Sequence, residues 1–135
     1  MKKPTKPTEQ TPEEKFNEVY DAAEAKAKII GDNLNPKCKV YPIVLYLEAE
    51  KEYVVGFARK PDMATQLRLI DKSDGRNGII NMEIGDKVMR ALIVTEECDK
   101  RIVDENEAYY DQYWKGAVFT LATFMGVATP LIKKK

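Results

Sequence analysis

Two runs of β-branched and aromatic residues, joined by a short polar link, constrain the fold of this chain most strongly. The runs cover residues 40–47 and 53–58, and residues 48–52 between them are short enough for the turn of a β-hairpin. Pro42 indicates that the first strand lies at an edge, or begins after this residue, because proline donates no hydrogen bond to a ladder. Two strands alone are barely stable in water, so helices from the rest of the chain must pack on them.

The residues before the hairpin predict a helix that follows a flexible arm. Residues 1–10 contain two prolines and no apolar run, so we expect this arm to stay outside the core. The helix start carries a capping box with proline at the first position, in Thr11, Pro12 and Glu14. Gly31 is expected to end the helix. Its apolar stripe consists of Phe16, Val19, Tyr20, Ala23, Ala27 and Ile30.

The chain after the hairpin is expected to be helical. Pro61 and Asp62 open a short helix whose inward residues are Met63, Leu67 and Ile70. Residues 71–78 are rich in Asp and Gly and predict a loop. Residues 79–95 are apolar on several faces, which is typical of a helix that is buried or sandwiched.

A last helix is expected over residues 105–127, after a charged link at residues 96–103. Asp104 and Glu107 repeat the capping-box pattern at its start. Its main stripe consists of Tyr110, Trp114, Ala117, Val118, Leu121, Phe124 and Met125.

These elements predict the α+β class: an N-terminal helix, a β-hairpin, and then three helices packed as one small domain. We expect this single domain to cover residues 11–132. The flexible arm of residues 1–10 precedes it, and a basic tail of residues 133–135 follows it.

The available side chains exclude several kinds of chemistry. The 135 residues include no histidine, which removes Ser-His-Asp and Cys-His catalysis and most zinc sites. Basic and acidic residues both number 22, so the chain lacks the basic surplus that nucleic-acid binding requires. Cys38 and Cys98 are interpreted as small buried apolar residues of a protein in a reducing cytosol.

The loop at residues 71–78 and two acidic clusters contain no valid binding motif. The loop fits neither the EF-hand register nor the phosphate-loop pattern. The acidic residues at 96–99 and 104–107 are interpreted as solvated helix caps, because helix N-termini favour acids. We therefore expect no catalytic residue, no metal site, no cofactor and no enzymatic activity. An enzyme with carboxylate chemistry is the alternative that the acidic clusters leave open.

The C-terminal segment supports a different alternative. Residues 116–132 contain no charge, are bounded by lysines and follow four aromatic residues, which is the outline of a tail anchor. The seventeen residues are at the lower limit for crossing a bilayer, and they include a proline and three threonines. A buried C-terminal helix explains the same pattern. A tail-anchored membrane protein with a soluble α+β head is thus the alternative function.

Four aromatic residues within six positions form the candidate partner surface: Tyr109, Tyr110, Tyr113 and Trp114. On a helix, Tyr110 and Trp114 share one face, and Tyr109 and Tyr113 lie about 100° away. The core can bury one pair and leave the other near the surface, where Tyr and Trp anchor protein interfaces. We take Tyr109, Tyr113 and Trp114 as candidate partner-binding residues. The alternative is that the hairpin covers Tyr109 and Tyr113, using Tyr46 and Phe57.

One arrangement along the chain resembles a known family. The second strand continues into Tyr-Val-Val-Gly-Phe-Ala-Arg-Lys-Pro at residues 53–61, followed by a short Met/Ala/Leu helix. A helix with an internal Gly85, an acidic link at residues 99–102 and a closing helix come next. Over residues 40–125 the chain resembles small tail-assembly chaperones and related morphogenesis proteins of tailed bacteriophages and prophages.

The resemblance implies a non-enzymatic protein of virion assembly. Proteins of this kind bind the long helical tape-measure protein, shield its apolar stretches and recruit tail-tube subunits. The implied partners are other proteins, in a homo-oligomer or a hetero-assembly, and neither nucleic acid nor a membrane. The implied location is the cytoplasm of a bacterial host, or the virion.

Overall fold

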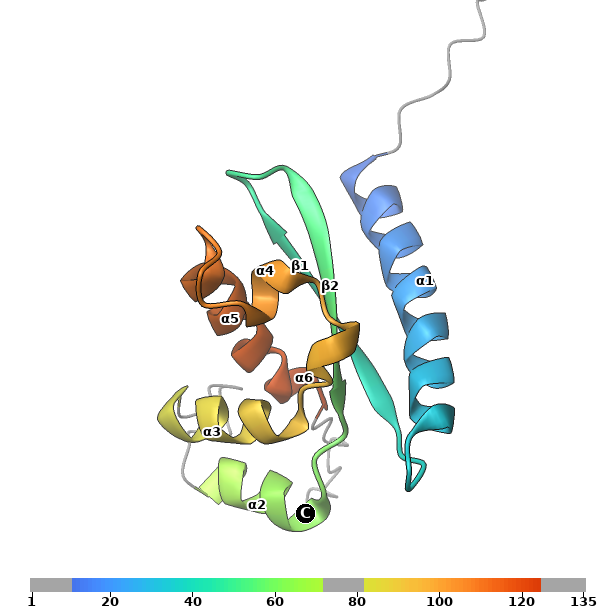
Figure 1. Ribbon diagram of the computed structural model, residues 1–135, viewed down its shortest axis with the longest axis vertical. Helices are drawn as coiled ribbons and strands as arrows, with labels where there is room; N and C mark the ends of the chain where they lie inside the picture. Colours follow the sequence, from blue (N-terminus) through green and yellow to red (C-terminus); the bar gives the residue numbers. More distant parts are fainter. Residues whose placement is uncertain (1–10, 72–81, 125–135) are drawn as a thin grey trace, which may run out of the picture.

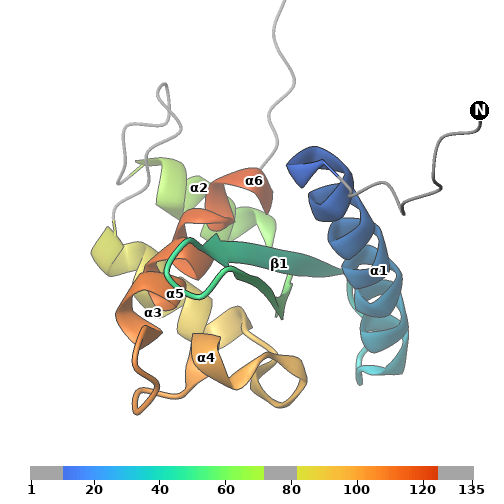
Figure 2. The same cartoon turned by 90° about the horizontal axis from the view of Figure 1, so that it is seen from above.

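The computed structural model describes residues 11–71 and 82–124 and confirms the α+β class (Figure 1). In chain order, the elements are α1 (Pro12–Asn33), β1 (Val40–Leu47), β2 (Glu52–Arg59), α2 (Met63–Asp71), α3 (Met82–Leu92), a 3-10 helix (Thr95–Glu97), α4 (Lys100–Val103), α5 (Tyr110–Phe119) and α6 (Leu121–Phe124). The hairpin lies in the middle: α1 covers one face, and the later helices gather on the other (Figures 1 and 2).

Helix α1 begins as its capping pattern predicts. The Glu14 amide donates to Thr11 Oγ1 over 3.1 Å, and the Thr11 amide donates to Glu14 Oε1 over 3.5 Å. The helix ends at Asn33, two residues later than predicted, because Gly31 has a different role. Gly31 is buried against the chain that leads into β1, and a Cβ atom there would collide with the carbonyl oxygen of Cys38. Glycine thus permits a close approach of α1 to the hairpin.

The hairpin forms over the predicted segments. Strand β1 has the predicted bounds, and β2 extends one residue further at each end. The strands are antiparallel, with Val44 opposite Val55 and Leu47 opposite Glu52. Side chains of successive residues point to opposite faces, so each strand contributes to both sides of the sheet.

Two apolar clusters result, one on each face of the hairpin. The cluster against α1 contains the buried residues Ala23, Ala27, Ile30, Val40, Phe57 and Val94. The larger cluster contains Ile43, Val54, Ala58, Leu69, Met89, Ile102, Tyr113, Ala117, Val118, Leu121 and Phe124. Phe16 was expected in the α1 stripe, but its side chain is 39% exposed because α1 meets the hairpin mainly through its small residues.

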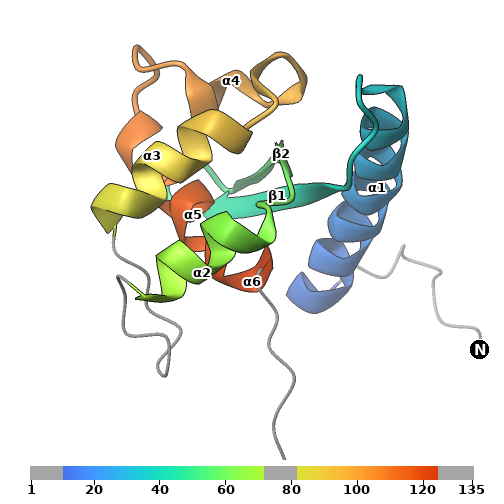
Figure 3. The same ribbon diagram turned by 90° about the horizontal axis from the view of Figure 1, so that it is seen from below.

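Helix α2 faces the core with a different side from the one predicted. Met63 and Leu67 were expected to point inward, but they are 65% and 57% exposed. Leu69 is fully buried instead, so the side of α2 that carries Leu69 faces the core. The loop was predicted over residues 71–78, but Asp71 is the last residue of α2. Residues 72–78 and the side chain of Ile70 lie outside the described residues. Figure 3 shows α2 beside α3.

The segment predicted as a charged link contains helical structure. It holds the 3-10 helix and α4, and the Asp99 carboxylate caps α4 by accepting from the Arg101 amide over 2.9 Å. Ile102 in α4 is fully buried under the hairpin, close to Gly56. An apolar residue at the centre of this charged segment therefore anchors it to the core.

The last helix begins five residues later than predicted. The Asp104 carboxylate accepts from the Asn106 amide in a turn, and α5 begins only at Tyr110. A break at Thr120 separates α5 from α6. The predicted continuation to Val127 and the rest of the uncharged segment lie outside the described residues. Within the described ranges, no helix is long and apolar enough to cross a membrane.

Candidate functional site

The structure buries one of the three candidate partner residues. Tyr113 is only 2% exposed, and its hydroxyl donates to Glu50 Oε1 over 2.9 Å. Leu45 of β1 packs against Gly116 one turn further along α5. The expectation that Tyr113 lies at the surface is therefore wrong, because the hairpin and its turn cover this face of α5. The cover consists of Leu45 and Glu50; Tyr46 and Phe57 belong to the face toward α1.

Trp114 is half-buried and holds α5 to α3. Its indole Nε1 donates to Asp86 Oδ1 over 2.7 Å, and Arg90 lies 5.1 Å from the ring centroid. Tyr110 stacks on the same indole at 6.0 Å. Hydrogen bonds from Trp114 and Arg90 hold the pKa of Asp86 below its usual range. Tyr109 is half-buried beside the larger cluster. A partner role for Tyr109 and Trp114 stays a prediction.

The acidic residues near α4 surround an arginine. Arg101 donates to Glu52 Oε2 over 2.8 Å and to Asp99 Oδ2 over 3.0 Å, and Glu50 lies 3.8 Å away. The bonds to Arg101 lower the pKa of Asp99. These contacts tie α4 to the hairpin turn. Among residues 11–71 and 82–124, no group of three or more His, Cys, Asp or Glu side chains could hold a metal ion.

Cys98 is a structural thiol. Its Sγ atom accepts from the Phe57 amide over 3.3 Å and donates to the Val94 carbonyl over 3.2 Å. Burial raises the pKa of Cys98 to about 11, so the thiol is protonated and weakly nucleophilic at neutral pH. Cys38 and Cys98 are both half-buried and form no disulfide.

Raising the pH should destabilise this fold between about pH 9 and pH 12. Burial and the bond to Glu50 raise the pKa of Tyr113 to about 12, and Cys98 is raised to about 11. In this range the unfolded chain loses these protons before the folded chain does, so ionisation favours unfolding as the pH rises. We expect Tyr113→Phe to show a smaller loss than the wild type in denaturant unfolding between about pH 8 and pH 11. An equal loss would contradict the assigned burial of Tyr113.

The outer edge of β1 is not paired with β2, and it is accessible at Val44 and Tyr46 but buried at Val40 and Pro42. The Lys60 amide donates to the Lys39 carbonyl over 2.9 Å, which sets the alternation of the ladder. Odd-numbered residues of β1 therefore bond to β2, and the even-numbered ones direct their backbone groups outward. The outward set is Val40, Pro42, Val44 and Tyr46. Pro42 thus occupies a position where no ladder bond needs its missing N–H, as expected of an edge strand.

The outer edge of β2 is covered, unlike that of β1. The Val94 amide donates to the Phe57 carbonyl over 2.8 Å, and the Asp99 amide donates to the Val55 carbonyl over 2.9 Å. Ile93 forms an isolated bridge with Ala58. No described residue makes such bonds to the outward groups of Val44 or Tyr46. An unpaired strand edge of this kind is a template for another strand.

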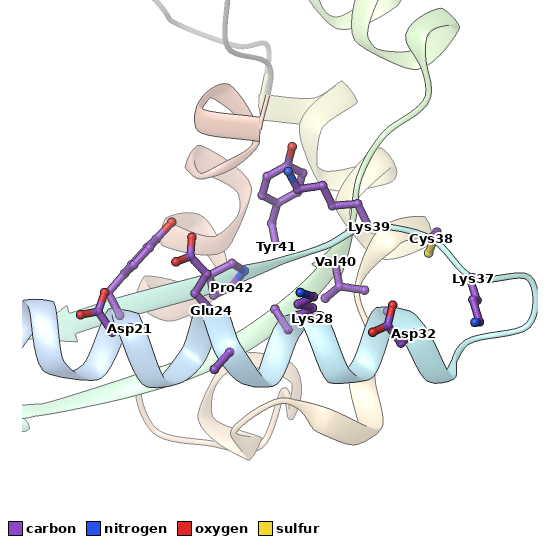
Figure 4. Close-up of a pocket in the computed structure, with 14 residues that line it drawn as sticks. Asp21, Glu24, Lys28, Asp32, Lys37, Cys38, Lys39, Val40, Tyr41 and Pro42 are labelled. Carbon is purple, nitrogen blue, oxygen red and sulfur yellow. The ribbon is translucent and has the colours of Figure 1, made fainter.

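A groove lies beside the first residues of β1, next to its outer edge. It has a volume of about 770 Å³ and is lined by α1, the loop after it and the start of β1 (Figure 4). Its charged residues are Asp21, Glu24, Lys28 and Asp32 from α1, and Lys37 and Lys39 from the other wall. Tyr41 points away from α1 in Figure 4 and stacks on Phe124 at 4.6 Å, with Lys39 Nζ 5.1 Å from its ring centroid. The edge therefore has a charged side toward α1 and an aromatic side toward α6.

Comparison with protein-family models, curated proteins and solved structures finds no match to this chain.

Pro42 is the one sequence signal that pointed to the β1 edge. No local pattern indicated that residues 93–99 would close the edge of β2.

Proposed function

We propose that this chain is a non-enzymatic assembly protein that binds another protein by accepting one of its segments as a strand beside β1. The observation that carries the proposal is the outward backbone of β1 at Val44 and Tyr46, whose two N–H and two C=O groups make no backbone bond to a described residue and are not buried. Main-chain hydrogen bonds supply affinity in strand addition, and alternate side-chain contacts supply specificity.

The two sides of the edge define the chemistry of the partner segment. Side chains on one side of an added strand would meet the charged wall of α1, with Asp21, Glu24 and Lys28. Those on the other side would meet Tyr41 and Phe124, which stack on each other. A segment that alternates polar or charged residues with apolar ones fits both sides.

The resemblance to tail-assembly chaperones supports a role in virion assembly. Its strongest element, the strand that leads through two basic residues to Pro61, forms the end of β2 and the start of the α2 region. Under this proposal the partners are tape-measure or other virion proteins, bound in a hetero-assembly in the cytoplasm of a bacterial host. Pairing of two β1 edges in a homo-oligomer would use the same backbone groups.

The non-enzymatic part of the proposal is supported by the structural hydrogen bonds that the Cys98 thiol and the carboxylates near α4 make. The Cys98 thiol is held protonated between backbone groups, and Asp99 and Glu52 bond to Arg101. The sequence contains no histidine that could serve as a base at neutral pH.

Val44→Pro should strongly weaken partner binding while keeping the hairpin. Residue 44 lies at an outward position, so proline removes an edge N–H without removing a bond to β2, as Pro42 already does. Val44→Ala is the matched control, because it shortens the same side chain and keeps the N–H. Overlapping peptides from the proteins encoded by neighbouring genes would be tested by fluorescence anisotropy.

We expect one segment to bind the wild type and Val44→Ala, with binding at least about tenfold weaker in Val44→Pro, the equivalent of about 1.4 kcal/mol. Equal binding by both variants would refute strand addition at β1. Neighbouring genes that encode no virion protein would refute the role in virion assembly and leave the edge proposal intact.

A further inference from the structure

A second hollow lies at the other end of the hairpin and is lined by the first turns of α1 and by residues of the hairpin turn. It is open and has a volume of about 1090 Å³. We call it the aromatic hollow, because three of the side chains that line it are Phe16, Tyr46 and Tyr53. It adjoins the outward edge of β1 at Tyr46, whose side chain lines the hollow.

The three rings form a continuous row. The ring centroids of Phe16 and Tyr53 are 6.3 Å apart, and those of Tyr53 and Tyr46 are 5.0 Å apart. Phe16 and Tyr46 at the two ends of the row are 39% and 47% exposed. Rows of exposed aromatic rings are the surfaces on which proline-rich segments in the polyproline II conformation dock.

The charged groups around the aromatic hollow are of both signs, and they include carboxylates that the basic groups of a ligand could approach. Its rim carries three carboxylates, Glu13, Glu48 and Glu52, and two ammonium groups, Lys15 and Lys51. Glu52 bonds to Arg101. Glu13 and Glu48 lie on opposite walls, one in α1 and the other in the hairpin turn.

The chain itself contains a segment of matching chemistry. Residues 4–7 read Pro-Thr-Lys-Pro, a P-x-x-P pattern, and Lys2, Lys3 and Lys6 make the segment basic. Polyproline II has three residues per turn, so Pro4 and Pro7 share one face about 9 Å apart. That spacing is comparable with the length of the ring row.

The attachment point of this segment lies at the hollow. Pro12, the first residue of α1, is one of its lining residues. The four residues 8–11 span up to about 13 Å when extended, enough for the chain to turn back over the rings. A tether this short gives a high effective concentration, so the segment of the same chain is favoured over that of a second copy.

We propose that the aromatic hollow binds a lysine-flanked P-x-x-P segment in the polyproline II conformation, and that its occupant is residues 2–7 of the same chain. The two prolines lie on Phe16, Tyr53 and Tyr46, and the lysines approach Glu13 and Glu48. The inference does not depend on the proposed strand addition, because it uses the side chains of the aromatic hollow and not the outward backbone groups of β1.

The full chain tests the proposal without risk to the fold, because the substitutions lie before α1. In amide NMR spectra, Pro4→Ala with Pro7→Ala should shift the signals of Phe16, Tyr46 and Tyr53. Thr5→Ala with Thr8→Ala is the matched control, and it should shift only signals near the substitutions. Shifts of the proline variant that are confined to residues 1–11 would overturn the proposal.

A peptide titration distinguishes the possible occupants. A free peptide with the sequence of residues 1–10 should shift the same three signals in the Pro4→Ala/Pro7→Ala chain, saturably and more weakly at high salt. The same peptide with alanine in place of both prolines should not. Lack of any effect of the first peptide would overturn recognition of the motif. Wild-type signals at these residues that change on dilution, together with a dimeric sedimentation mass, would overturn the assignment to the same chain.

Discussion

Phe57→Ala should lower the free energy of unfolding by about 3–5 kcal/mol. Phe57 is among the largest fully buried side chains, and it fills the space between the hairpin and α1. Ala23 and Ala27 of α1 are too small to fill the cavity that the substitution would leave. Urea denaturation followed by circular dichroism would measure the loss.

Val55→Ala is the control for this prediction. Val55 lies two residues before Phe57 on the same face of β2 and is only half-buried. We expect a clearly smaller loss than for Phe57. If Phe57→Ala cost no more than Val55→Ala, the smaller cluster would not be what holds α1 on the hairpin.

Leu121→Ala should lower the free energy of unfolding by about 2–4 kcal/mol. Leu121 has no exposed surface and belongs to the larger cluster with Val118 and Phe124. Removing its methyl groups leaves a cavity among side chains that the hairpin and the helices hold in place.

Phe119→Ala is the matched control, because Phe119 is near the same helix junction but more than half exposed. We expect its effect to stay within about 0.5 kcal/mol, as for most surface substitutions. Guanidinium denaturation of both variants gives the comparison. Similar losses in the two variants would show that the side chains of this junction are not divided between core and surface as described.

The sequence predicted those features that depend on residues close together in the chain. The Thr11 capping box starts α1 because its two hydrogen bonds join residues three positions apart. The bounds of β1 follow from a run of β-branched and aromatic residues, which fit a pleated surface wherever they pack. Pro42 indicated an edge strand because its missing N–H acts at its own position.

The register of the later helices could not be predicted in the same way. Tyr113 and Tyr110 are equally aromatic, and the contact that buries Tyr113 comes from Glu50, which is 63 residues away in the chain. Likewise, Leu67 was predicted to face the core, but Leu69 does so in the structure. The packing partners decide which side of a short helix faces the core. Periodicity alone gives a stripe, but it does not give the surface that the stripe meets.

The sequence predicted one of the two conditions for the candidate site. An open edge needs one strand with a free side and a second strand whose outer side is covered. The first condition follows from Pro42, and the second depends on the amides of Val94 and Asp99, which bond to β2 across some forty residues of chain. Such pairing is set by tertiary packing and leaves no local pattern.

Amide hydrogen exchange along β1 tests the strand-addition proposal most directly. In the free chain, the Val44 and Tyr46 amides should exchange rapidly, and the Ile43 and Leu45 amides should be protected by their bonds to β2. With the partner segment bound, Val44 and Tyr46 should become protected to a similar degree. Protection of Val44 that is unchanged by a bound partner would contradict the proposal that β1 accepts a strand.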